Sequence, residues 1–150
     1  MESPVKLDMT KFDELRRNLQ YLSSKVVKIG ILNNPEQAWK AYQNEYGFVT
    51  EEGYKTPARS NVQYPIENNE GHIMKSLKEN LGDFSKDNID KSLERAGETG
   101  LKAIDMAFET RGYGTWKENA PMTVAIKGKN TPLIDTGELR KSYSYEVTDE

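Results

Sequence analysis

A single apolar stripe through residues 86–110 constrains the fold of this 150-residue chain more than any other feature. Its members recur every three or four residues, the spacing that places side chains on one face of an α-helix. The stripe consists of Ile89, Leu93, Ala96, Leu101, Ile104 and Phe108. Gly97 and Gly100 weaken the helical pattern, so we predict that they mark close packing or a bend. The pattern predicts one long helix against which the other elements pack.

Shorter elements are predicted on both sides of this helix. β-branched and alternating patterns indicate strands, and apolar residues at helical spacing indicate helices. The predicted strands cover residues 25–32 and 142–147, the predicted helices cover 8–22, 36–46 and 70–81, and a further short element covers 122–127. We therefore expect one α+β domain over residues 1–150, with a small mixed or antiparallel sheet packed against the long helix and shorter helices.

Apolar side chains gather on one face of each of the first two predicted helices. In the helix at 8–22, which Asp8 or Thr10 can cap, they follow a spacing of three and four residues. These residues are Met9, Phe12, Leu15, Leu19 and Leu22. In the helix at 36–46, the corresponding residues are Ala38, Trp39, Tyr42 and Tyr46.

Residues 48–69 are rich in Gly, Pro, Asn and Thr, and Pro57 and Pro65 interrupt them. A connection of this length without regular structure is unusual inside a compact domain and is often functional. We therefore predict a long irregular loop that can lie over a neighbouring copy as an arm. Tyr54 and Tyr64 are its candidate interface residues.

A charged pair is predicted between Glu45 and Arg59. Glu45 lies near the end of the helix at 36–46, and Arg59 lies where the chain returns after the loop. An Arg side chain can hold a carboxylate with two parallel hydrogen bonds, which would fix the path of the loop. The alternative is an exposed Arg59 without a partner.

Composition excludes several classes of function. The chain has no Cys and a single His, His72, which excludes disulfides, thiolate metal sites, Cys nucleophiles and a His–His metal pair. A net charge of −3 argues against a dedicated nucleic-acid binder, which carries a clear basic excess. No apolar run reaches the about 18 residues that span a membrane, and no secretory signal is predicted. We expect no cofactor and no metal.

A low apolar content favours association between chains. Only 35% of the residues are apolar or Tyr, so the core is expected to be thin and to complete its burial against a partner. The strand near the end of the chain is expected to be an edge strand, which can pair with a neighbouring copy. In this strand Tyr143, Tyr145 and Val147 face one side, and the two tyrosines are candidate interface residues.

The segment Leu133-Ile134-Asp135-Thr136-Gly137 has the local pattern of an aspartic-protease catalytic loop, for which a homodimer would supply the second carboxylate. Only 13 residues follow Gly137, too few for the flap and strands of a retroviral-type protease. A structural role is favoured, in which Asp135 or Thr136 caps a short helix at 137–141 and Thr136 anchors it together with Leu139.

Replacing Asp135 or Thr136 by Ala is therefore expected to lower the free energy of unfolding by about 0.5–2 kcal/mol, the usual cost of a lost cap. No hydrolytic activity should change. Urea unfolding and a peptide-cleavage assay on each variant measure the two effects. Loss of a measurable hydrolysis without loss of folding would contradict the structural role.

Several short blocks follow one another in a definite order between residues 25 and 148. They are Val27-Lys28-Ile29-Gly30-Ile31, Asn44-Glu45-Tyr46-Gly47, Pro57-Ala58-Arg59 and Pro132-Leu133-Ile134-Asp135-Thr136-Gly137-Glu138-Leu139-Arg140-Lys141-Ser142. In this order and spacing the chain resembles the bacteriophage virion-morphogenesis proteins, the small neck or tail-completion proteins of Mu-like and lambda-like tailed phages. The segment at residues 48–56 is longer and more charged than the corresponding segment in that family.

The resemblance implies a non-enzymatic virion protein, assembled in the host cytoplasm, that forms a ring between tail and head. Its implied partners are other copies of itself, six being favoured over twelve, the head connector on the portal side, and tail tube or tail terminator proteins. DNA would pass through the lumen without specific binding, which an acidic protein suits. The alternatives are the aspartic-protease-like homodimer and a small non-catalytic binding or regulatory module.

Overall fold

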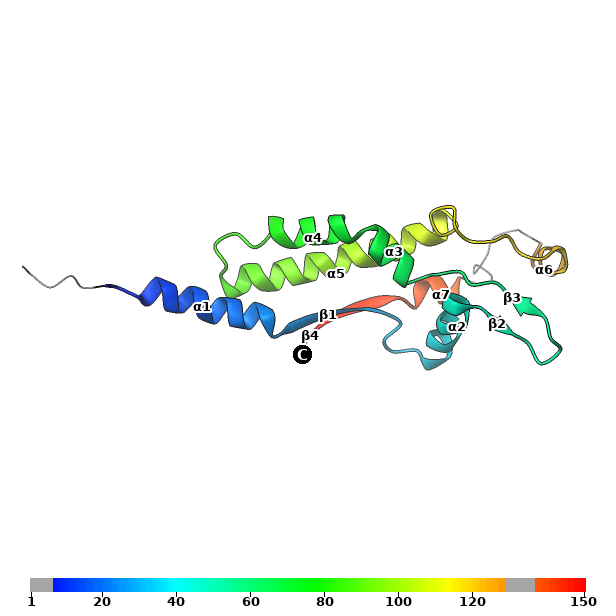
Figure 1. Ribbon diagram of the computed structural model, residues 1–150, viewed down its shortest axis with the longest axis horizontal. Coiled ribbons are helices and arrows are strands. Elements are labelled where there is room, and N and C mark those ends of the chain that lie inside the picture. The colour runs from blue at the N-terminus through cyan, green and yellow to red at the C-terminus, as the bar shows by residue number, and fades with distance from the viewer. Residues whose placement is uncertain (1–6, 129–136) are drawn as a thin grey trace, which may run out of the picture.

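The computed structural model describes residues 7–128 and 137–150, and the chain has an elongated shape (Figure 1). Helix α1 (Thr10–Ser23) lies at one end of the molecule. At the opposite end lie helix α2 (Pro35–Tyr46) and a hairpin of strands β2 (Phe48–Val49) and β3 (Lys55–Thr56). The predicted α+β class is confirmed.

The middle of the molecule is a two-stranded sheet covered by helices. The strands are β1 (Lys25–Gly30) and β4 (Ser144–Asp149). Helix α5 (Lys86–Glu109) lies on this sheet, and helix α4 (Glu70–Glu79) packs against α5. The short helices are α3 (Gln63–Asn68), α6 (Pro121–Lys127) and α7 (Glu138–Lys141). The short element predicted at 122–127 is thus helical.

Strands β1 and β4 pair antiparallel, with Lys25 opposite Asp149 and Gly30 opposite Ser144. Within the described residues each of these strands has only the other as a neighbour. The strand at the end of the chain is therefore an edge strand, as predicted. Its exposed N–H and C=O groups on the outer side remain available to another chain.

Helix α5 is the long helix that the sequence predicted. Ser85 caps its start by accepting a hydrogen bond from the Asn88 amide at 3.3 Å. Most of the predicted stripe is buried, and a run of residues with positive φ at 111–114 ends the helix. Gly97 and Gly100 mark close packing, because an added Cβ would overlap the ring of Tyr145 or the tip of Ile29, respectively.

Gly97→Ala is expected to destabilise the protein by about 1–2 kcal/mol, although Ala favours a helix by about 1 kcal/mol over Gly. The added methyl group would overlap ring atoms of Tyr145, which cannot bend away. Gly100→Ala is the matched control, because it meets the flexible end of Ile29 and should be close to neutral. Urea unfolding measures both; a Gly97→Ala protein as stable as the parent would contradict this packing.

The prediction of a long irregular loop at 48–69 is confirmed only in part: residues 50–54 and 57–62 have no helix or strand, whereas 48–49, 55–56 and 63–68 do. This segment forms the β2–β3 hairpin and then helix α3, elements too short to leave a periodic pattern in the sequence. Pro65 is buried, and Tyr64 packs edge-on against Tyr113 with ring centroids 6.3 Å apart. The hairpin tip projects into solvent, and Tyr54 there is 73% exposed.

Candidate functional site

A polar cluster joins the end of α2 to the segment that leads into α3, and Glu45 is its centre. The carboxylate accepts hydrogen bonds from the Ser60 hydroxyl at 2.6 Å and from the amides of Asn61 at 2.6 Å, Val62 at 3.0 Å and Gln63 at 3.1 Å. These amides stand at the start of α3, where backbone N–H groups have no partner within the helix. A negative charge is favourable at such a position. Glu45 therefore holds the start of α3 against the end of α2.

The predicted pair between Glu45 and Arg59 is wrong, and so is the alternative of an exposed Arg59. Arg59 is only 6% exposed, and burial lowers the pKa of its guanidinium. Its Nε donates to the carbonyl of Lys117 at 2.8 Å and its Nη2 to the carbonyl of Glu118 at 3.0 Å. The Glu45 carboxylate is hydrogen-bonded to the backbone amides at the start of α3. Arg59 instead connects the loop to the segment that follows α5 through hydrogen bonds.

Asn61, which the sequence did not single out, is the fully buried member of this cluster. Its Nδ2 donates to the carbonyls of Ala41 at 3.0 Å and Arg59 at 3.2 Å. Its Oδ1 accepts a hydrogen bond from the Tyr143 hydroxyl. Burial raises the pKa of that phenol, and the charge of Glu45 adds to the shift. Tyr143 is thus a core residue and not the exposed interface residue that the sequence suggested.

The other predicted site residues are spread over the molecule. Tyr145 packs on Gly97 and donates to Glu94 Oε2 at 2.8 Å. Leu139 is buried on α7, and Gly137 precedes that helix with a left-handed φ of 84°. Asp135 and Thr136 lie outside the described residues, so their capping role stays a prediction.

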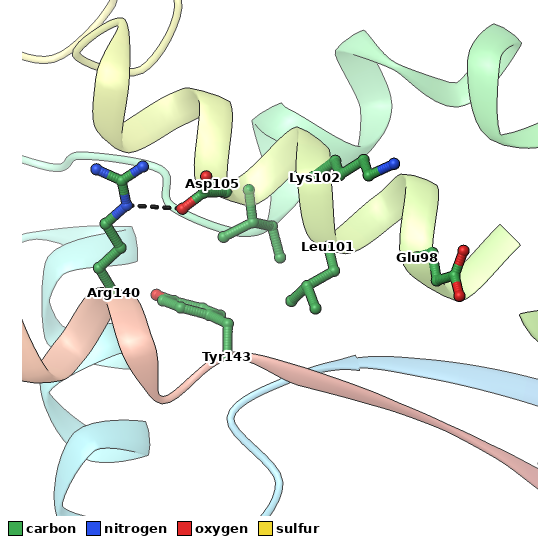
Figure 2. Close-up of a pocket in the computed structure, with 7 residues that line it drawn as sticks. Glu98, Leu101, Lys102, Asp105, Arg140 and Tyr143 are labelled. Carbon is green, nitrogen blue, oxygen red and sulfur yellow. Dashed lines mark hydrogen bonds and ion pairs between the residues drawn. The ribbon is translucent and has the colours of Figure 1, made fainter. Parts of the chain in front are cut away.

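A cavity of about 330 Å³ opens between α5 and α7 (Figure 2). It is lined by Glu98, Leu101, Lys102, Ile104, Asp105, Arg140 and Tyr143. The guanidinium of Arg140 donates to Asp105 at 2.6 Å and to Glu109 at 3.0 Å, so its charge is already neutralised. None of these lining residues, all within the described chain, is Ser, Thr, Cys or His.

Arg140→Gln is expected to reduce the loss of stability in acid. Arg140 holds the pKa of Asp105 below its usual value, chiefly through the hydrogen bond between them. The pair therefore stabilises the fold above the unfolded-state pKa of Asp105, and this contribution is lost as the pH falls through the lower folded-state pKa. Without Arg140, the pKa of Asp105 should rise toward its ordinary value.

An NMR titration of the Asp105 carboxyl measures this change directly. Arg95→Gln is the matched control, because Arg95 lies on α5, the helix that carries Asp105, and pairs with Glu98 at 3.1 Å instead. It should leave the Asp105 titration unchanged. An Asp105 pKa that is the same in Arg140→Gln as in the parent would show that the pair has no such effect.

Two apolar surfaces remain exposed at opposite ends of the molecule. The first, the α1 stripe, consists of Met9, Phe12, Leu15 and Leu19, which are 43–57% exposed. The second, the α2 ladder, consists of Trp39, Tyr42 and Tyr46, which are 58–63% exposed. The spacing in the sequence correctly placed each set on one face of a helix. That these faces point to solvent follows only from the structure.

The rings of the α2 ladder contact one another in sequence along the helix. The centroids of Trp39 and Tyr42 are 5.6 Å apart with nearly parallel planes, and those of Tyr42 and Tyr46 are 5.1 Å apart in an edge-on arrangement. These ring contacts hold the side chains in place and present a preformed apolar surface. Large exposed apolar patches on a folded chain typically mark sites of interaction.

The chain matches no protein-family model, no curated protein and no solved structure. In the part of the chain that the structure describes, no three His, Cys, Asp or Glu side chains are grouped so that they could hold a metal ion. None of the described helices combines the length and apolar character needed to cross a bilayer.

Proposed function

We propose that this chain is a structural subunit of the neck of a tailed bacteriophage, where it forms a ring that completes the tail and joins it to the head connector. The sequence blocks resemble those of bacteriophage virion-morphogenesis proteins, and this resemblance suggests that the particle is a tailed phage. The observation that carries self-assembly is the exposure of two apolar surfaces at opposite ends of one subunit, because an isolated monomer leaves both in water.

Further features support a ring around a DNA channel. The edge strand β4 and the hairpin tip with Tyr54 offer additional contact surfaces to neighbouring copies and to connector or tail proteins. A net charge of −3 suits a lumen through which DNA slides without binding. We propose six copies, with twelve as the second choice, because rings of this family follow the symmetry of the tail.

Deleting the gene from its phage tests the proposal. Electron microscopy of the lysate should show filled heads and separate tails, and adding the purified protein should restore joined, infective particles. Joined and infective particles formed without the protein would overturn the proposal.

The same assay separates the structural role from the protease alternative. Asp135→Asn should restore joining as well as the parent protein, because a structural subunit needs no catalytic carboxylate. A folded Asp135→Asn protein that fails to restore joining, together with loss of a peptide-cleaving activity, would favour the protease.

A further inference from the structure

We propose that the α1 stripe of one copy docks on the α2 ladder and its adjoining groove in the next copy, so that the chains associate head to tail. The inference deepens the proposed function and rests on it for the biological setting, because a ring requires a contact between two different surfaces of the same subunit.

The donor surface is a helix that its own chain leaves largely uncovered. No residue of α1 is buried in the described structure, and the helix projects from the body of the molecule (Figure 1). It is held near its C-terminal end, where the Tyr21 hydroxyl donates to Asp90 at 2.8 Å and Lys86 lies 5.1 Å from the centre of the Tyr21 ring. The α1 stripe is thereby presented to another molecule.

The receiving surface combines the α2 ladder with a groove of about 360 Å³. Residues 29–32 form one side of this groove, and Ala38, Tyr42 and Tyr46 of α2 form the other. The α1 stripe spans about 15 Å from Met9 to Leu19 at the usual rise of a helix. A stripe of this length can pack along the ladder as one helix packs on another, with side chains filling the groove.

Charge favours contact between different ends over contact between two copies of α1. Arg16 lies four residues after Phe12 and three before Leu19, so it borders the α1 stripe. Glu51 and Glu52 are exposed at the hairpin tip that follows α2. Among the described residues none of these three charges has an ion-pair partner. Head-to-tail docking brings the opposite charges together, whereas docking of two α1 stripes brings two Arg16 side chains together.

Disulfide capture tests the contact, and the chain suits it because it has no cysteine of its own. Leu19→Cys is mixed with Trp39→Cys, Tyr42→Cys or Tyr46→Cys and oxidised. We expect at least one pair to form the mixed disulfide about ten times faster than the control pairs, because docking raises the effective concentration. The control replaces Leu19→Cys by Arg17→Cys, whose side chain lies across the helix from the stripe. Rates equal to the control in all three mixtures overturn the proposal.

Mixing single-ended variants tests the direction of the contact. Phe12→Asp removes the donor surface and Tyr42→Asp the receiving surface, and circular dichroism checks that both exposed substitutions leave the fold intact. In analytical ultracentrifugation, we expect each variant to be monomeric alone and the mixture to form a dimer that grows no further. Association of Tyr42→Asp on its own would show that α1 docks on α1, which overturns the proposal.

A charge exchange adds a readout that a non-specific apolar contact would not move. Arg16→Glu should slow the disulfide capture, and Glu51→Lys with Glu52→Lys in the receiving copy should restore it. Arg17→Glu, the matched control, should have no effect. Equal effects of Arg16→Glu and Arg17→Glu would contradict the assigned orientation. If disulfide capture fails while gene deletion still leaves heads and tails apart, the proposed contact is wrong and the neck function stands. If capture succeeds and gene deletion has no effect, the contact stands and the neck function is wrong.

Discussion

Replacing Glu45 by Gln is expected to lower the free energy of unfolding by about 3 kcal/mol, a large loss for one substitution, because charge-assisted hydrogen bonds are strong and their loss leaves donors unpaired. The carboxylate accepts from the Ser60 hydroxyl and from three amides at the start of α3. An amide of the same size keeps one acceptor oxygen and turns a donor toward the remaining N–H groups. Urea unfolding measures the loss.

Glu36→Gln is the matched control on the same helix. Its carboxylate is exposed and pairs with Lys40 at 2.8 Å, one turn further along α2. Exposed pairs of this kind contribute only about 0.3–0.5 kcal/mol. Similar losses in the two variants would mean that the Glu45 carboxylate does not hold the start of α3.

Asn61→Ala is expected to cost about 3 kcal/mol as well, because it leaves buried polar groups without partners. The carbonyls of Ala41 and Arg59 lose a side-chain donor and the Tyr143 hydroxyl loses its acceptor, in an environment closed to water. Asn44→Ala is the control, since the Asn44 side chain donates to Lys40 in an exposed position at 2.8 Å. Thermal and urea unfolding of both variants measure the difference.

A double-mutant cycle with Tyr143→Phe isolates one bond of this cluster. If the Tyr143 hydroxyl donates to Asn61, the two substitutions together should cost about 1 kcal/mol less than the sum of the single costs. Additive costs would show that the two side chains do not interact.

The polar cluster lies beyond sequence reasoning because its partners are chosen by the fold. The sequence correctly singled out Glu45 and Arg59 as structural residues but paired them wrongly. Their opposite charges predicted that they bind each other. The backbone decides otherwise, since α3 presents free amides to Glu45 and the segment after α5 presents free carbonyls to Arg59. Nearly every residue carries the same backbone donor and acceptor, so no pattern of residue types predicts which backbone groups a side chain will bind.

The sequence by itself determined the elements whose causes are local. Asn34 and Pro35 begin α2, Ser85 begins α5, and a Gly-rich run ends α5, because capping and backbone preferences act over a few residues. The close packing at Gly97 was also readable, since glycine inside a helix requires a reason.

Only the tertiary structure decided which faces are covered. The stripe on α5 and the stripe on α1 have the same apolar spacing, yet the first is buried and the second faces solvent. The difference arises because the sheet and α3 and α4 occupy the space along α5, whereas α1 extends past the end of the body. Periodicity defines a face; what covers that face depends on contacts between residues far apart in the chain, or on another chain.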